Sequence, residues 1–388
     1  MREWVQVEHM AAGGDGLAHL ADGRVVFVEG ALPGETVVAD VHTLRKDYGK
    51  ARVAEVVEAS PHRVVPPCPE VARGCGGCGW QHADPLAQLQ WKADIVAEAL
   101  RRTGREADAV VTVGGAVSPW GYRTTMRLAV TDTGRVGLRS AHSHHVVPLS
   151  QCPVAHPALS ALLGDVRVHG AEELVLRVSV ATGAVTAFTP EVRGRVEGLP
   201  EHPGLGPAAA LHEVVDGVRL RVSAASFFQS GPEAASLLVD TVRRACGDLL
   251  QDPDRGPVLD AYGGIGLFAA TLGLRDAVVV ESSSSSCADA RVNLAHATID
   301  EMVFEEWPVR PVRLAIVDPA RAGLGAPAVD VLVATQAERI VLVSCDPVSL
   351  ARDTALLRER GYAHRGTTVL DLFPHTPHVE AVTVFEPV

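Results

Sequence analysis

Lysine is almost missing from this chain of 388 residues: it occurs only at positions 46, 50 and 92, so arginine supplies nearly all of the 35 basic residues. The formal net charge is −12, which argues against a protein that coats nucleic acid through bulk positive charge. An RNA enzyme with a local basic groove remains compatible with this charge. The one lysine-bearing basic cluster, formed by Arg45, Lys46, Lys50 and Arg52, is where we expect RNA to bind.

Long hydrophobic runs are also missing, and none approaches the roughly 20 residues that a membrane-spanning helix needs. The N-terminus, Met1-Arg-Glu-Trp-Val5, lacks the apolar core of a secretory signal. We therefore expect a cytoplasmic protein without a membrane partner. The seven cysteines are an odd number, and three of them crowd between residues 68 and 78. In the cytoplasm such crowding indicates a metal site rather than disulfides.

Residues 1–60 alternate short β patterns with turns. Strands are predicted at 4–7, 24–28, 36–41 and 50–57, and tight turns at Gly13-Gly-Asp-Gly16 and Leu32-Pro-Gly-Glu35. This spacing predicts a five-stranded OB-like barrel, a fold that often binds RNA. A purely structural β unit is the alternative.

The clustered cysteines predict a metal centre. Cys75 and Cys78 are separated by two glycines that let the backbone wrap a metal, and Cys68 lies shortly before them. A fourth ligand is needed, and Cys152 is the best candidate. Four thiolates suit an iron–sulfur cluster or a structural zinc ion, and the spacing alone does not separate the two. His82 leaves a Cys₃His zinc site as a weaker alternative.

One helix and several strands are predicted between the cysteines and residue 222. The helix covers 84–104, with Asp84 as its cap, and a β-hairpin covers 121–139. Further strands are predicted at 173–180 and 217–222. Arg123 and Arg127 share a face of the hairpin if it is extended, where solvated surface arginines are the simplest interpretation.

From about residue 221 helices alternate with buried strands, which is typical of a parallel α/β sheet. Residues 257–269 predict a strand, a glycine loop and a helix, and the next strand ends in Glu281. Gly264, Gly266 and Ala269 satisfy a loose G-x-G-x-x-A motif, which is weak evidence by itself. A carboxylate at the end of the second strand suits ribose hydroxyls, and it fits NAD and S-adenosylmethionine equally well.

Two later strands end in reactive side chains, Asp318 and Cys345. The carboxyl ends of the strands are where ligands bind in such sheets. A thiol there can be a nucleophile, and Glu380 is a candidate proton-transfer partner for it. The local pattern equally permits Cys345 to be a small buried hydrophobe.

Taken together, these residues resemble the bacterial RNA uracil-5-methyltransferases that carry an N-terminal TRAM domain and an iron–sulfur cluster, the 23S ribosomal RNA uracil-5-methyltransferase-like family. The resemblance spans nearly the whole chain. It rests on the turns at 13–16 and 32–35, the four cysteines 68, 75, 78 and 152, Phe228-Gln229, Asp318-Pro-Ala-Arg321, Ser344-Cys345, Ala351-Arg-Asp353, and Asp371-Leu-Phe-Pro-His-Thr376 through Glu380.

The resemblance implies a Rossmann-like methyltransferase that uses S-adenosylmethionine to methylate carbon 5 of a uridine. Cys345 would add to carbon 6 of the uracil, Glu380 would remove the carbon 5 proton, and Asp318 would contact the uracil or the cofactor. The cofactor would be held by Gln229, Tyr262, Gly264, Glu281 and Asp318, and a [4Fe-4S] cluster by Cys68, Cys75, Cys78 and Cys152, with zinc as the weaker alternative.

The resemblance also implies a division into three parts. Residues 1–60 form the TRAM barrel, 61–84 and 116–220 a central β-rich part with the cluster, and 85–115 and 221–388 the catalytic domain. We expect a monomer whose partner is RNA, either 23S rRNA or tRNA, and not DNA. The remaining alternatives are a tRNA uridine-54 methyltransferase, a non-catalytic RNA-binding iron–sulfur protein and an NAD-dependent oxidoreductase.

Two departures from the family pattern concern the catalytic part. Asp346 stands where the family usually has asparagine after the nucleophile. The segment between Glu281 and Asp318 is short, so Thr298-Ile-Asp-Glu-Met302 is expected to be a reduced strand, with Asp300 or Glu301 facing the cofactor.

Overall fold

The N-terminal sixty residues form a coiled six-stranded sheet. The computed structural model describes residues 1–191, 194–251 and 256–388. The strand order of this first sheet is β1-β5-β6-β4-β3-β2. Its strands are β1 Arg2–Gln6, β2 His9–Met10, β3 Gly16–His19, β4 Val25–Glu29, β5 Thr36–Leu44 and β6 Tyr48–Glu58. Side chains such as Val26, Val28 and Val37 fill its core.

The structure therefore has six strands here where the sequence pattern predicted five. The difference lies at the Gly13–Gly14 turn, where both glycines have positive φ angles of 99° and 103°. This turn closes a hairpin between β2 and β3. The two arms have only two and four residues, which is too short for an alternating pattern to be recognised.

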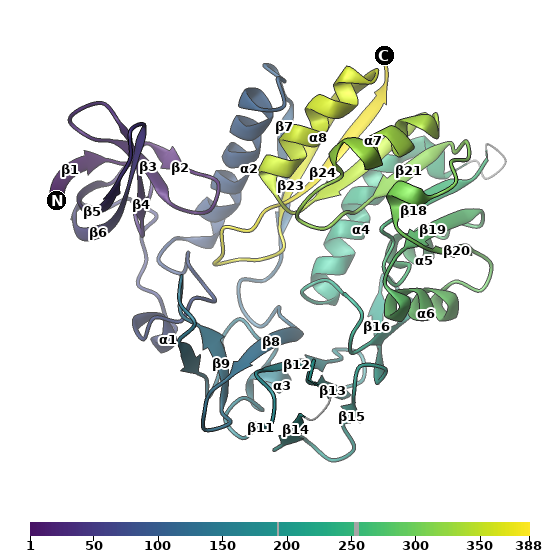
Figure 1. Ribbon diagram of the computed structural model, residues 1–388, viewed down its shortest axis with the longest axis horizontal. Helices are drawn as coiled ribbons and strands as arrows, with labels where there is room; N and C mark the ends of the chain where they lie inside the picture. The colour runs from purple at the N-terminus through teal and green to yellow at the C-terminus, as the bar shows by residue number, and fades with distance from the viewer. Residues whose placement is uncertain (192–193, 252–255) are drawn as a thin grey trace.

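The cysteine-rich segment leads from this sheet into a long helix. A short helix, α1 Pro69–Ala72, follows Cys68, and α2 spans Pro85–Arg102. The side chain of Asp84 caps α2 by accepting the N–H of Leu86, as the sequence predicted. α2 packs against the C-terminal sheet, beside β23 and β7 (Figure 1).

The central part is built from short strands around a six-stranded sheet of order β10-β9-β8-β12-β13-β15. Two two-stranded sheets, β11-β14 and β16-β17, accompany it. The bounds are β8 Thr125–Val130, β9 Val136–Arg139, β10 Val146–Pro148, α3 Pro157–Ser160, β11 Arg167–His169, β12 Glu173–Val178, β13 Val185–Phe188, β14 Arg195–Glu197, β15 Gly204–Leu205, β16 Ala210–Val215 and β17 Val218–Ser223. The predicted hairpin is confirmed as β8 and β9.

The C-terminal part, together with β7, forms an eight-stranded sheet of order β20-β19-β18-β21-β22-β24-β23-β7. Its strands are β7 Val111–Ala116, β18 Val258–Ala261, β19 Ala277–Glu281, β20 Thr298–Glu301, β21 Leu314–Val317, β22 Arg339–Ser344, β23 Tyr362–Asp371 and β24 Glu380–Pro387. The reduced strand expected near Thr298 is confirmed as β20. The prediction of a parallel sheet is wrong at one strand, because β24 runs antiparallel to both β22 and β23.

Helices cover both faces of this sheet (Figure 1). They are α4 Pro232–Cys246, α5 Leu267–Thr271, α6 Ser284–Asn293, α7 Gly325–Ala334 and α8 Pro347–Glu359, with 3₁₀ turns at Gly247–Leu250 and Phe304–Glu306. Alternate residues of each strand point to opposite faces. Leu314 and Ile316 accordingly pack with α4, whereas Ala315 and Val317 pack with α2 and α7. Among the described residues, no helix is both long and apolar enough to span a bilayer.

Candidate active site

The carboxyl ends of the central strands form a small pocket. Its walls include Gln229, Tyr262, Gly264 and Asp318, four of the five residues predicted to hold the cofactor. The cavity measures about 30 Å³. Phe227 lies at its edge, with 67% of its surface exposed. The structure thus brings together side chains from three separate stretches of the chain, at the place where ligands bind in such sheets.

The fifth predicted residue, Glu281, supports the pocket from the side. Its carboxylate accepts the backbone N–H of Gly264 at 3.0 Å and that of Ser283 at 2.7 Å. Gly264 has a φ of 56°, in the left-handed region that glycine adopts without strain. Glu281 therefore holds the turn that forms the pocket wall.

Tyr262 is fixed on its other side by aromatic packing. Its hydroxyl donates to Glu305 at 3.1 Å, and its ring lies 5.4 Å from that of Phe304. The two acids of β20 that we expected to face the cofactor, Asp300 and Glu301, have other partners. Asp300 accepts from the indole of Trp307, and Glu301 pairs with Arg291.

Cys345 and Glu380 are brought together by the antiparallel pairing of β22 with β24. This register places Ser344 opposite Ala381, so the next pair outward is Cys345 and Glu380. Cys345 is half-buried, and only 4% of the surface of Glu380 is exposed. Asp318 follows β21, the parallel neighbour of β22. The three predicted catalytic residues therefore share one edge of the sheet.

Burial dominates the electrostatics of these three groups. It raises the pKa of Glu380, and the nearby charge of Asp318 raises it further. Burial, aided by the charge of Glu281, raises the pKa of Asp318 to about 7. The pKa of Cys345 is raised to about 11 by burial and by the charges of Glu380 and Asp318, whereas the charge of Arg321 opposes this rise. The ligand-free site therefore favours protonated acids and a neutral thiol.

A fourth acid, Asp260, was not predicted from the sequence. It lies in β18 and is completely buried. One of its oxygens accepts the N–H of Ala269 at 3.2 Å, and the other has no hydrogen-bond partner among the described residues. Burial and the charges of Asp318 and Glu281 raise its pKa to about 7. A carboxylate inside the apolar run Val258–Ala261 was the signal that could have revealed it.

Asp260 gives the protein a testable pH dependence. Because its pKa is raised from 3.8 to about 7, the folded state binds this proton more tightly than the unfolded state. The stabilisation of the folded state by the proton on Asp260 is therefore greatest below pH 3.8 and is lost as the pH rises to 7. We expect Asp260→Asn to be more stable than wild type by roughly 2 to 4 kcal/mol at pH 8 but nearly equal at pH 4. Denaturant unfolding at both pH values measures this, and parallel stability curves would contradict it.

Two aspartates of the family motifs shape the surrounding loops. Asp346 caps α8 by accepting the N–H groups of Val348 and Ser349. Because asparagine and aspartate are comparable helix caps, the departure at this position preserves the cap. Asp353 accepts the N–H groups of Leu324 and Gly325, which anchors the loop that follows Asp318.

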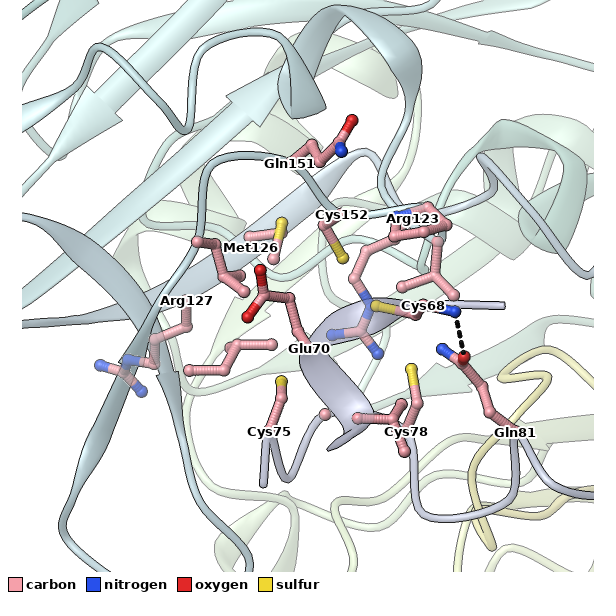
Figure 2. Close-up of a pocket in the computed structure, with 16 residues that line it drawn as sticks. Cys68, Glu70, Cys75, Cys78, Gln81, Arg123, Met126, Arg127, Gln151 and Cys152 are labelled. Carbon is pink, nitrogen blue, oxygen red and sulfur yellow. Dashed lines mark hydrogen bonds between the residues drawn. The ribbon is translucent and has the colours of Figure 1, made fainter. Parts of the chain in front are cut away.

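The four predicted metal ligands surround a second cavity, of about 80 Å³ (Figure 2). Cys68, Cys75, Cys78 and Cys152 all line it, and none of them forms a disulfide. Burial raises the pKa of three of the thiols, to about 12 for Cys78. Within the described ranges, no group of three or more His, Cys, Asp or Glu side chains meets at a point where one metal ion could be held.

Glycines place the Cys75–Cys78 loop close to β9. A Cβ atom added to Gly76 would lie 2.7 Å from the carbonyl oxygen of Arg139, and one added to Gly77 would lie 2.7 Å from Leu138. His82, the weaker alternative ligand, is not among the residues that line this cavity. Arg123 and Arg127 both line it (Figure 2), and Arg123 is half-buried. Arg127 is largely exposed and pairs with Glu173.

Comparisons with known proteins identify the parts of the chain. Residues 4–54 match the TRAM domain, and residues 311–387 match the tRNA (Uracil-5-)-methyltransferase family. An uncharacterized RNA methyltransferase of Streptomyces avermitilis is 36% identical, over 99% of this chain and 98% of that protein. The 23S rRNA (uracil(1939)-C(5))-methyltransferase RlmD of Halomonas elongata is 33% identical, over 99% of this chain and 89% of that protein.

The chain belongs to the RNA (uracil-5-)-methyltransferase family. It is an enzyme of this class. The tRNA (uracil-54, C5)-methyltransferase of Pyrococcus abyssi, solved with S-adenosyl-L-homocysteine, has the same fold, with a TM-score of 0.72 and 24% identity over 98% of this chain and 99% of that chain. The fold is thus that of S-adenosylmethionine-dependent methyltransferases with an N-terminal TRAM domain.

Proposed function

We propose that this methyltransferase transfers the methyl group of S-adenosylmethionine to carbon 5 of one uridine in structured 23S rRNA. The observation that carries the proposal is that Cys345 and Glu380 adjoin the last residue pair of β22 and β24, Ser344 and Ala381, and share this edge of the sheet with Asp318. The reaction needs a nucleophile and a base that act on the same uracil. The side chains of Cys345 and Glu380 come from the ends of adjacent strands. The names of the RlmD relatives support 23S rRNA.

In the proposed chemistry the Cys345 thiol first loses its proton to solvent, and the thiolate then adds to carbon 6 of the uracil. The ring becomes an enolate, and carbon 5 attacks the methyl group, releasing S-adenosylhomocysteine. Glu380, once its carboxyl group has ionised, then removes the carbon 5 proton, which re-forms the ring double bond and expels the thiolate. The raised pKa of Glu380 makes its carboxylate a stronger base than an exposed glutamate. The target base must leave its stack to reach this site.

The methyl donor would lie against Gln229, Tyr262, Gly264 and Asp318, which line the pocket. Glu281 supports the pocket wall through Gly264, and its position at the end of β19 suits contact with the ribose hydroxyls. NAD is the alternative occupant, but an NAD-dependent oxidoreductase leaves Cys345 and Glu380 without a role. We expect calorimetry to show binding of S-adenosylmethionine and no binding of NAD. Binding of NAD alone would reject the proposal.

The RNA substrate can be identified directly. We expect 5-methyluridine to disappear from one position of 23S rRNA in a strain that lacks this gene. Purified protein should restore it with S-adenosylmethionine. Loss at position 54 of tRNA instead would favour the tRNA enzyme, and loss at neither would reject both of these RNA substrates. The exposed residues Arg45, Lys46, Lys50 and Arg52 of the TRAM sheet are where we place part of the RNA contact.

We further propose that Cys68, Cys75, Cys78 and Cys152 hold an iron–sulfur cluster. A single zinc ion needs four sulfur atoms about 2.3 Å from one point. The cavity of about 80 Å³ has room for several atoms, since one water needs only about 10 to 15 Å³ of cavity volume measured in the same way. Four thiolates suit a [4Fe-4S] cluster. The methyl transfer itself transfers no electron, so the cluster would hold these loops in place.

The proposed cluster leads to a separate prediction. We expect anaerobically purified protein to contain about four iron atoms and to show a brown charge-transfer band. Cys78→Ser should lose most of this iron, because serine is a poor ligand for iron in such clusters. Cys246→Ser should keep it, since Cys246 lies in the core formed with α4. Stoichiometric zinc without iron would reject the cluster.

A further inference from the structure

Lys92 of α2 forms a completely buried ion pair with Asp371 at the end of β23. The Nζ atom lies 2.6 Å from Oδ1 of Asp371, and both side chains are at most 1% exposed. Burial lowers the pKa of Lys92 and raises the pKa of Asp371, and each charge counteracts the shift of the other. Apolar residues in place of such a pair are often equally stable or more stable. Stability alone therefore does not account for a lysine at this position.

The ion pair sits at the base of the segment that carries Glu380. Asp371 ends β23, and its neighbour Leu370 pairs with Glu380 at the start of β24. Lys92 also donates to the carbonyl oxygen of Phe373 at 3.1 Å, and Asp371 accepts the N–H of Phe373 at 3.0 Å. One charged group of α2 thus fixes the first turn of the connection between β23 and β24.

Gln88, one helical turn before Lys92, fixes the next part of the same segment. Its side-chain oxygen accepts the N–H of His375 at 2.7 Å, and its amide donates to the carbonyl oxygen of Trp80 at 3.2 Å. Trp80 in turn donates its backbone N–H to the carbonyl oxygen of His375. Further along, His378 lies against Arg321, with 2.7 Å between Nη2 and Nδ1. The segment therefore connects α2 with both Glu380 and the Asp318–Arg321 loop.

We propose that Lys92 is a positioning residue for the Asp371–Glu380 segment and thereby orients the Glu380 carboxylate for proton removal. Lys92 touches neither Cys345 nor the pocket at Asp318, so it acts through this segment. The inference rests on the proposed role of Glu380. It assigns to the buried ion pair a function in the later, proton-removing half of the reaction.

The test uses Lys92→Met, Asp371→Asn and the double variant in the full-length protein. Arg101→Met is the matched control, because Arg101 lies on the same helix and is exposed. We expect the single variants to be destabilised and the double variant to regain much of the melting temperature. In the double variant we expect kcat to remain about 10- to 100-fold low, because small displacements of a reacting group have effects of this size. KM for the RNA should stay near the wild-type value, and the covalent protein–RNA complex should accumulate.

Recovery of wild-type kcat together with the melting temperature would overturn the proposal, since the pair would then serve stability alone. Hydrogen–deuterium exchange tests the positioning role of Lys92 and does not require the protein to be active. We expect faster exchange in residues 371–380 of the double variant and unchanged exchange in residues 1–60. Unchanged exchange at 371–380 would also overturn it. If the wild-type protein itself transfers no methyl group, the proposed function fails, whereas the exchange result still decides the role of Lys92.

Discussion

Cys345→Ala should abolish methyl transfer to RNA, with a loss of at least about 10³-fold in turnover. Without the thiolate, carbon 5 of the uracil is too weak a nucleophile to attack the methyl group. The covalent complex with RNA should disappear as well. RNA transcribed with 5-fluorouridine is a sensitive probe of this complex, because Glu380 can remove a proton but not fluorine. A gel under denaturing conditions then shows the trapped complex for wild type and nothing for the variant.

Cys246→Ala is the control for this experiment. Cys246 ends α4, is completely buried and lies away from the pocket residues. Its loss should lower stability slightly and leave turnover unchanged. Binding of S-adenosylmethionine should persist in Cys345→Ala, which separates lost chemistry from lost folding. Methyl transfer at the wild-type rate in Cys345→Ala would falsify the proposed mechanism.

Glu380→Gln should slow turnover by about 10² to 10⁴-fold, the usual range for loss of a general base. Its effect differs in kind from that of Cys345→Ala. Addition of Cys345 and transfer of the methyl group do not need the base, so they still occur. The thiolate cannot leave until the carbon 5 proton is removed. We therefore expect a methylated protein–RNA complex to accumulate with ordinary uridine RNA, which gel analysis and mass spectrometry detect.

Glu386→Gln is the matched control, since Glu386 lies on the same strand and pairs with Arg339 at the surface-exposed end. This control should turn over normally and show no persistent complex. The assignment of Glu380 is wrong if Glu380→Gln turns over normally, or if it is inactive and forms no complex while it still folds and binds S-adenosylmethionine.

Local patterns were sufficient for much of the fold. The Asp84 cap and the helical spacing after it predicted α2, and the hairpin of β8 and β9 follows from the turn at Thr133-Gly134. These features depend on residues a few positions apart, so the sequence shows them directly. The short β2 and β3 arms and the antiparallel β24 were not found. A strand of two or four residues is too short to show a clear alternation of apolar and polar residues. The direction of a strand depends on partners that are distant in the sequence.

In the candidate site, too, some features are visible in the local sequence and others are not. Local patterns showed which side chains end the strands, because a buried run that stops at Asp318 or Cys345 is visible in the sequence. The crowding of cysteines indicated the four candidate metal ligands, and the family resemblance implied the role of Glu380 as the base. The packing of distant segments was needed to place Cys345 and Glu380 at the same end of two paired strands, to bring Asp260 among the buried acids, and to pair Lys92 with Asp371, 279 positions away. The physical reason is that a buried charge takes its partner and its pKa from whatever the fold packs against it, and neither is encoded in its neighbours along the chain.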